Sequence, residues 1–300
     1  MSVTIQSILA SWSPSPGIIA VTLLVGAIYL GGFIGLHRQM PLRFPVWRLL
    51  AFLGGLVLML VALVSPLEAF DDVLLSAHMT QHILLLFAAP PMLLLGAPAI
   101  PLVRGLPVSI AKYVLGPPLK CQTIRRLGHK LTHPIVCGIA FVAATWGWHV
   151  PALFEAALRS SGWHAIEHGC FIGTGLMFWF PVVQPWPSTP HWPRWAIFFY
   201  LLFADAANTV LSAFFIFSER LLYPFYASVP RISNFTPMDD QIAAGAIMWV
   251  PASLFFLIPG AVILFRFLSP RGMVRPPKDV MHGDSSSNRM PIAPGQSFSE

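Results

Sequence analysis

Two pairs of histidines have the spacing of ligands that share one face of a helix. His78 and His82 are four residues apart in S-A-H-M-T-Q-H. His164 and His168 are four residues apart in W-H-A-I-E-H. Side chains at positions i and i+4 of a helix are neighbours, with Cβ atoms about 5–6 Å apart. Two such imidazoles can bind one metal ion at about 2.0–2.1 Å from each nitrogen. If the two helices face each other, the pairs form one metal site.

Further polar residues accompany these pairs. His149, in G-W-H-V-P, is a fifth and weaker candidate ligand. Glu167 lies between the second pair, and Asp240 stands in M-D-D-Q-I-A. Their carboxylates could bind the ion, or accept the second N–H of a ligating imidazole. Gln81 and Gln241 could orient their neighbours. Imidazole suits copper, zinc, iron and nickel, and thioethers favour Cu(I).

The composition shows what kind of element must position these residues. Hydrophobic residues make up 56% of the 300 residues, charged residues only 10%, and mean hydropathy is +0.70. Soluble domains carry about 25% charged residues. A soluble enzyme, a disulfide-rich secreted scaffold and a disordered chain are therefore excluded. The net charge of +6 does not indicate a nucleic-acid partner, because the basic residues lie in loops and the tail. Cys121, Cys137 and Cys170 lack the paired spacing of a disulfide framework or a thiolate metal site.

The apolar residues occur in seven blocks of about the length that spans a hydrocarbon core. We therefore predict an all-α, polytopic membrane bundle of seven transmembrane helices. The third block contains Pro90, Pro91 and Pro98, so it is predicted to kink or break. The blocks cover residues 17–36, 47–64, 79–103, 134–152, 163–183, 195–217 and 241–265.

The basic residues predict which way the bundle faces. Cytoplasmic loops of membrane proteins carry an excess of lysine and arginine. This rule predicts an outer N-terminus and a cytoplasmic C-terminus, and it places the five candidate histidines just below the outer surface. Fifteen of the eighteen basic residues then fall on the cytoplasmic side: Arg38, Arg43, Arg48, Arg104, Lys112, Lys120, Arg125, Arg126, Lys130, Arg194, Arg266, Arg271, Arg275, Lys278 and Arg289.

Three other segments carry predictions. We expect a membrane domain over residues 1–269 and a disordered, Pro- and Ser-rich cytoplasmic tail over 270–300. The basic loop over 104–130 is predicted to lie along the anionic leaflet. Asp205 and Asn208 fall near the middle of the sixth block, where polar groups serve either function or helix packing.

The histidine pattern admits three interpretations besides a copper site. Two imidazoles from facing helices could hold a haem iron. The stretch H-A-I-E-H also matches H-x-x-E-H, in which two histidines bind zinc and the glutamate activates water for an intramembrane peptidase. In the third interpretation the chain is a scaffold, and the histidines serve packing only.

Six stretches, in this order, resemble the multi-span CtaG family of cytochrome c oxidase assembly factors. The resemblance runs from about residue 43 to 264. The stretches are S-P-L-E-A-F-D-D-V-L-L-S-A-H-M-T-Q-H (65–82), A-P-P-M-L-L-L-G-A-P (89–98), G-W-H-V-P-A-L-F (147–154), W-H-A-I-E-H (163–168), L-L-Y-P-F-Y (221–226) and D-Q-I-A-A-G-A-I-M-W-V-P (240–251).

The resemblance implies a seven-span protein of the bacterial inner membrane that is needed to make an active haem–copper oxidase and takes part in delivering copper to it. Our hypothesis is a non-enzymatic assembly factor that holds copper, as Cu(I), at the outer ends of spans three, four and five. Its partners would be oxidase subunits and membrane lipid. One departure is Ala244 before Gly245, where two glycines are expected. The residues that match positions expected in the family are His78, Gln81, His82, His149, His164, Glu167, His168 and Asp240.

Overall fold

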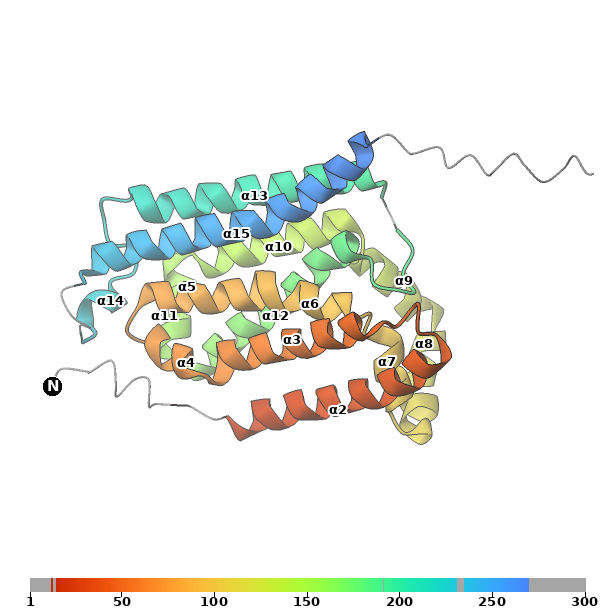
Figure 1. Cartoon of the computed structure of the whole chain (residues 1–300). Helices are drawn as coiled ribbons and strands as arrows, with labels where there is room; N and C mark the ends of the chain where they lie inside the picture. The colour runs from red at the N-terminus through yellow and green to blue at the C-terminus, as the bar shows by residue number, and fades with distance from the viewer. Residues whose placement is uncertain (1–11, 13–14, 191, 231–234, 270–300) are drawn as a thin grey trace, which may run out of the picture.

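The computed structural model describes residue 12 and residues 15–190, 192–230 and 235–269, and within these residues it is a bundle of helices without strands (Figure 1). The predicted all-α class is confirmed. The predicted tail over 270–300 lies outside the described residues.

In the described part of the chain, six helical segments are long and apolar enough to cross a membrane, and a bent pair of helices makes a seventh if it is taken as one span. This confirms a multi-pass helical bundle, while the sidedness stays a prediction. The six segments are α2 (Pro16–Gln39), α3 (Val46–Val64), the run Leu75–Leu95, α12 (Ser161–Val183), α13 (Arg194–Phe217) and α15 (Pro237–Leu268). The pair joins α9 (Gln122–Leu131) and α10 (Pro134–Trp148) with a bend of 63°. Helix α10 ends before the predicted limit of 152, because a new helix starts at Pro151.

The third span differs from its predicted limits of 79–103. It consists of α5 (Leu75–Ile83), a π-helical turn η1 (Leu84–Ala88) and α6 (Ala89–Leu95). The chain then breaks before Pro98, where Ala97 has a φ of 49°, and α7 (Ala99–Gly105) follows separately. The predicted break is confirmed, but the span starts and ends earlier than hydropathy suggested.

The π-helical turn has a physical cause in the proline that follows it. Pro90 has no N–H, so it cannot donate to the carbonyl of Leu86 four residues earlier. The indole Nε1 of Trp179, on α12, donates to that carbonyl instead, at 3.1 Å. This bond between the third span and α12 joins the two elements that carry the histidine pairs.

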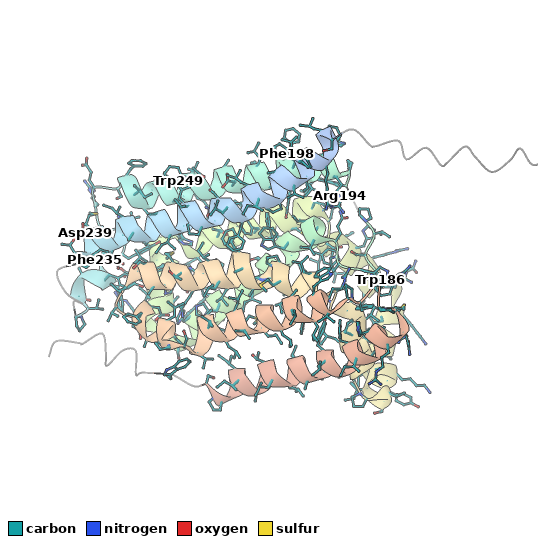
Figure 2. All side chains as sticks on the ribbon, in the orientation of Figure 1. Trp186, Arg194, Phe198, Phe235, Asp239 and Trp249 are labelled. Carbon is teal, nitrogen blue, oxygen red and sulfur yellow. The ribbon has the colours of Figure 1, made fainter. Side chains whose placement is uncertain are left out.

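The two ends of the bundle differ in their short helices. We call one of them the site end. Here lie α4 (Pro66–Asp71), α11 (Pro151–Arg159) and α14 (Phe225–Ser228), and here α5, α12 and α15 begin (Figure 1). Figure 2 shows Asp239 at this end and Arg194 toward the other. The other end holds α7, η2 (Ile110–Leu115), α8 (Gly116–Lys120) and α9, so the predicted loop over 104–130 is largely helical.

The polar residues predicted in the sixth span connect two helices. Ser253 on α15 donates to Asp205 Oδ1 at 2.6 Å, and Asn208 Nδ2 donates to the carbonyl of Met248 at 2.8 Å. Both bonds join α13 to α15, which lie side by side along the bundle (Figure 1). The packing alternative is therefore favoured for this pair.

Candidate metal centre

A hydrogen bond holds α5 against α3, and a glycine lets α12 approach the third span closely. Gln81 Nε2 on α5 donates to the carbonyl of Ala62 on α3 at 2.9 Å. On α12, a Cβ at Gly175 would lie only 2.9 Å from the carbonyl oxygen of Leu86, so a larger residue would push the helices apart. The close approach brings the two i,i+4 histidine pairs together.

All five predicted histidines lie in one cluster at the site end. Ring centroids are 4.3 Å apart for His78 and His82 and 4.1 Å apart for His164 and His168. Between the helices, the His78 and His164 rings stack at 5.3 Å with an interplanar angle of 15°. The ring of His149, which directly follows α10, lies 5.9 Å from that of His82.

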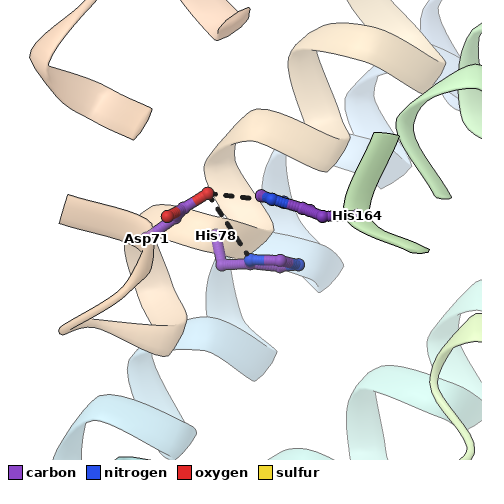
Figure 3. A group of neighbouring side chains, drawn as sticks. All are labelled: Asp71, His78 and His164. Carbon is purple, nitrogen blue, oxygen red and sulfur yellow. Dashed lines mark ion pairs between the residues drawn. The ribbon is translucent and has the colours of Figure 1, made fainter. Parts of the chain in front are cut away.

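Two buried carboxylates reach into this cluster. Glu167 places Oε2 3.7 Å from His78 Nε2 and Oε1 3.5 Å from His82 Nε2. Asp71, the last residue of α4, places Oδ2 3.5 Å from His164 Nε2 and 3.9 Å from His78 Nδ1 (Figure 3). The side chain of Glu167 is fully buried and that of Asp71 is 2% exposed. Asp71 was not among the predicted ligands.

These separations fit two ligands of one ion better than hydrogen bonds. An N–H···O hydrogen bond spans 2.7–3.2 Å, shorter than every one of these contacts. Two atoms bound tetrahedrally at about 2.0–2.1 Å from an ion lie roughly 3.3–3.4 Å apart. Within the residues described, two groups of three bring their ligand atoms close enough to share an ion. They are Asp71 with His78 and His164, and His78 with His82 and Glu167.

The cluster also concentrates buried polar atoms that lack a hydrogen-bond partner within the described part of the chain. An unpartnered buried polar group costs about 1–3 kcal/mol. A bound cation would satisfy several of them at once. These atoms are Asp71 Oδ2, His78 Nδ1 and Nε2, His82 Nδ1 and Nε2, His164 Nε2, Glu167 Oε1 and Oε2, and His168 Nε2.

The electrostatics around Asp71 favour a cation in the same place. Burial raises the pKa of the Asp71 carboxyl to about 8, and the neighbouring carboxylates of Asp72 and Glu68 add to this rise. A positive charge beside Asp71 would stabilise its ionised form and replace the proton. Asp71 therefore suits a cation ligand at neutral pH.

His149 lies beside the two groups without belonging to either. Its Nδ1 lies 2.6 Å from the carbonyl oxygen of Thr145 and its Nε2 lies 3.3 Å from the sulfur of Met79. Met79 is fully buried. An imidazole next to a thioether is a ligand pair that suits Cu(I).

Asp240, a predicted ligand, is used differently in the structure. Its Oδ2 accepts from the N–H of Leu75 at 2.6 Å and its Oδ1 from the N–H of Ser76 at 3.1 Å. The first N–H groups of a helix have no partner within the helix, and the residue before α5, Leu74, offers no side-chain acceptor. Asp240 on α15 therefore caps α5 and positions His78, three residues after Leu75.

Three side-chain hydrogen bonds connect the stretch 221–226 to its surroundings. Gln241 accepts from the N–H of Leu222 at 2.7 Å. The hydroxyl of Tyr223 donates to the carbonyl of His149 at 2.8 Å. The hydroxyl of Tyr226 donates to the carbonyl of Asp71 at 2.9 Å. Both tyrosines come from the stretch 221–226, one of the six that resemble the CtaG family.

Comparison with known proteins identifies the family of the chain. The chain is 28% identical to uncharacterized proteins of Mycobacterium bovis and Mycobacterium tuberculosis over 256 residues, and 26% identical to one of Mycobacterium leprae over 253 residues. These alignments cover 80–82% of the chain but only 37–38% of the relatives, so the chain spans less than half of their length. No solved structure matches it. The sequence model of the cytochrome c oxidase caa3 assembly factors matches residues 27–269, and the chain belongs to this family.

Proposed function

We propose that this protein binds copper, as Cu(I), at the histidine–carboxylate cluster and supplies it to a haem–copper oxidase during assembly. The observation that carries the proposal is the set of buried ring nitrogens and carboxylate oxygens in and around the two groups, which face one another without hydrogen bonds. Family membership supplies the process, oxidase assembly. Oxidase subunits would be the partners, and the bacterial inner membrane the location.

Copper is favoured over other ions by the ligands that surround the two groups. Imidazole nitrogens supply most of the donors, and the thioether of Met79 lies next to His149. Thioethers select Cu(I), whereas zinc sites are built from imidazole, thiolate and carboxylate. The position at one end of the bundle suits exchange of an ion with another protein.

The haem alternative fits the geometry less well. A haem held by two histidines needs a porphyrin plane between the imidazoles. Here the rings pack directly on one another, with centroid distances of 4.1–5.3 Å among the closest pairs. This packing supports a small ion rather than a macrocycle.

The peptidase alternative is also less well supported. In H-x-x-E-H enzymes the glutamate activates a water beside an ion held by the two flanking histidines. Glu167 instead places both oxygens within 3.7 Å of imidazole nitrogens of α5. Its placement is that of a ligand, and the side chain is fully buried.

The proposal is tested by metal analysis of purified protein and by oxidase assembly in cells. We expect copper in the wild type and its loss in His78→Ala, because His78 belongs to both groups. Cells with His78→Ala should then make an oxidase deficient in copper. The matched control is His129→Ala, on α9 at the other end of the bundle, which should retain copper.

Two outcomes would contradict the proposal. A haem absorption band in the purified protein would show that the protein binds haem, and would favour the haem alternative over copper. A His78→Ala variant that supports normal oxidase copper and activity would show that the cluster serves packing only.

A further inference from the structure

The imidazole of His78 is shared by the two groups, and each of its nitrogens faces a different one. Nδ1 lies 3.9 Å from the carboxylate of Asp71, and Nε2 lies 3.7 Å from that of Glu167. We propose that the cluster holds two ions at once, bridged by the His78 ring. The outer ion is bound by the group of Asp71, His78 and His164. The inner ion is bound by the group of His78, His82 and Glu167. This proposal rests on the proposed metal-binding function and adds its stoichiometry and its order of loading.

One ion alone leaves the arrangement unexplained. A single ion can bind only one nitrogen of a ring, and the other nitrogen would then hydrogen-bond to the opposite carboxylate, as ligating histidines usually do. Both nitrogens of His78 lie beyond the 2.7–3.2 Å of a hydrogen bond from their carboxylates. Neither nitrogen has another partner among the described residues, although the side chain is fully buried. Nδ1 and Nε2 of His78 therefore each lie where a ligand atom would face an ion.

The charges suit a pair of ions. Asp71 and Glu167 are buried on opposite sides of His78, and among the described residues neither forms an ion pair with a lysine or arginine. For the ring to bridge, the N–H of neutral His78 must release its proton to water. Two ions then face two carboxylates and one imidazolate. The net charge is one negative unit for two monovalent ions and one positive unit for two divalent ions.

The two positions differ in access to the surface. The outer group includes His164, whose side chain is 20% exposed. In the inner group, the side chain of His82 is 5% exposed and that of Glu167 is fully buried. An ion therefore reaches the inner position through the outer one, and the outer ion leaves first. The inner position adjoins His149 and Met79, which would favour Cu(I) there.

The test is a titration of the purified full chain with Cu(I) against a chromophoric chelator. We expect two ions in the wild type, removed by the chelator in a fast and a slow phase. His164→Gln and Asp71→Asn should each keep one ion and lose the fast phase. Glu167→Gln should keep one ion and lose the slow phase, and His78→Gln should lose both ions.

A second readout separates bridging from two independent sites. After loading with Cu(II), an imidazolate-bridged pair is spin-coupled, so the wild type should show a weaker paramagnetic resonance signal than its copper content predicts. His164→Gln should restore the full signal of one isolated ion. The control, His129→Gln, should behave as the wild type, and helicity and elution volume confirm folding of each variant.

Three results would overturn the inference. One ion in the wild type, weakened alike by His164→Gln and Glu167→Gln, would show a single site and leave the proposed function standing. Two ions with uncoupled spins would show that the His78 ring does not bridge them. A folded wild type that binds no copper would overturn the proposed function as well.

Discussion

Asp240 shows how a carboxylate can position a candidate metal centre through backbone hydrogen bonds alone. Both of its oxygens accept backbone N–H groups at the start of α5, one turn before His78. It comes from α15, 165 residues away along the chain from its partner Leu75. The geometry of the centre therefore depends on a contact between two spans that are remote in sequence.

Replacing Asp240 with asparagine should lower the stability of the protein without removing an ion. Hydrogen bonds to a charged group contribute about 1.5–3 kcal/mol, and we expect a loss of this size in the free energy of unfolding. Thermal unfolding in detergent measures this loss of stability. Metal analysis of the variant should give the same copper content as the wild type.

The neighbouring Asp239 provides the control for this change. Among the residues that the structure describes, Asp239 bonds only to Thr236, in an exposed capping box at the start of α15, so Asp239→Asn should have a smaller effect than Asp240→Asn. If Asp240→Asn loses copper while its melting temperature stays that of the wild type, Asp240 is a ligand.

Among single residues, the sequence predicted that the histidines would lie together, but it did not predict that Asp71 would lie beside them. The histidines could be predicted because i,i+4 spacing within one helix is a local property. Asp71 could not, because its position depends on how α4 packs on α5 and on the bond that Tyr226 makes to its carbonyl. Asp240 was expected either to bind the ion or to accept an imidazole N–H, because spacing cannot show that backbone N–H groups meet its oxygens instead.

Among the helices, the contact between the third span and α12 leaves no room for an added side chain at Gly175. A Cβ at Gly175 would lie 2.9 Å from both the carbonyl oxygen of Leu86 and the ring of Pro90. The bond from Trp179 to the same carbonyl holds the two elements at this separation. Because the histidine pairs lie on these two elements, their separation depends on this contact.

Replacing Gly175 with alanine should therefore weaken copper binding from a distance. Overpacking of this kind typically costs about 1–3 kcal/mol, and here it would move α12 away from α5. We expect a lower melting temperature and a lower affinity in chelator competition. Gly173→Ala on the same helix is the control, since a Cβ there meets nothing within 4 Å. Equal affinities in the two variants would contradict this role for Gly175.

The elements themselves were predicted more accurately than their ends. Hydropathy predicted the spans because each appears in the sequence as an apolar stretch long enough to cross the bilayer. It missed the start of α5, since Asp240 on another span supplies the cap. It also missed the π-helical turn before Pro90, which depends on the indole of Trp179 as an alternative donor.

For the whole molecule, the two ends of the bundle carry different chemistry. The site end holds the candidate metal centre, and the other end holds α7, α8 and α9 with most of the loop basic residues. The positive-inside rule predicts that the site end faces outward. An outward site would present copper on the face where another protein in the periplasmic space could receive it.

Cysteine labelling tests this orientation with residues that the chain already offers. Cys121 is exposed at the other end, and Ser228 is exposed at the site end. In a background with Cys137→Ala and Cys170→Ala, a membrane-impermeant maleimide should label Cys121 only after cells are lysed. With Cys121→Ser and Ser228→Cys added, the same reagent should label intact spheroplasts. The opposite pattern would place the site end in the cytoplasm, and copper would then have to be supplied from the inside.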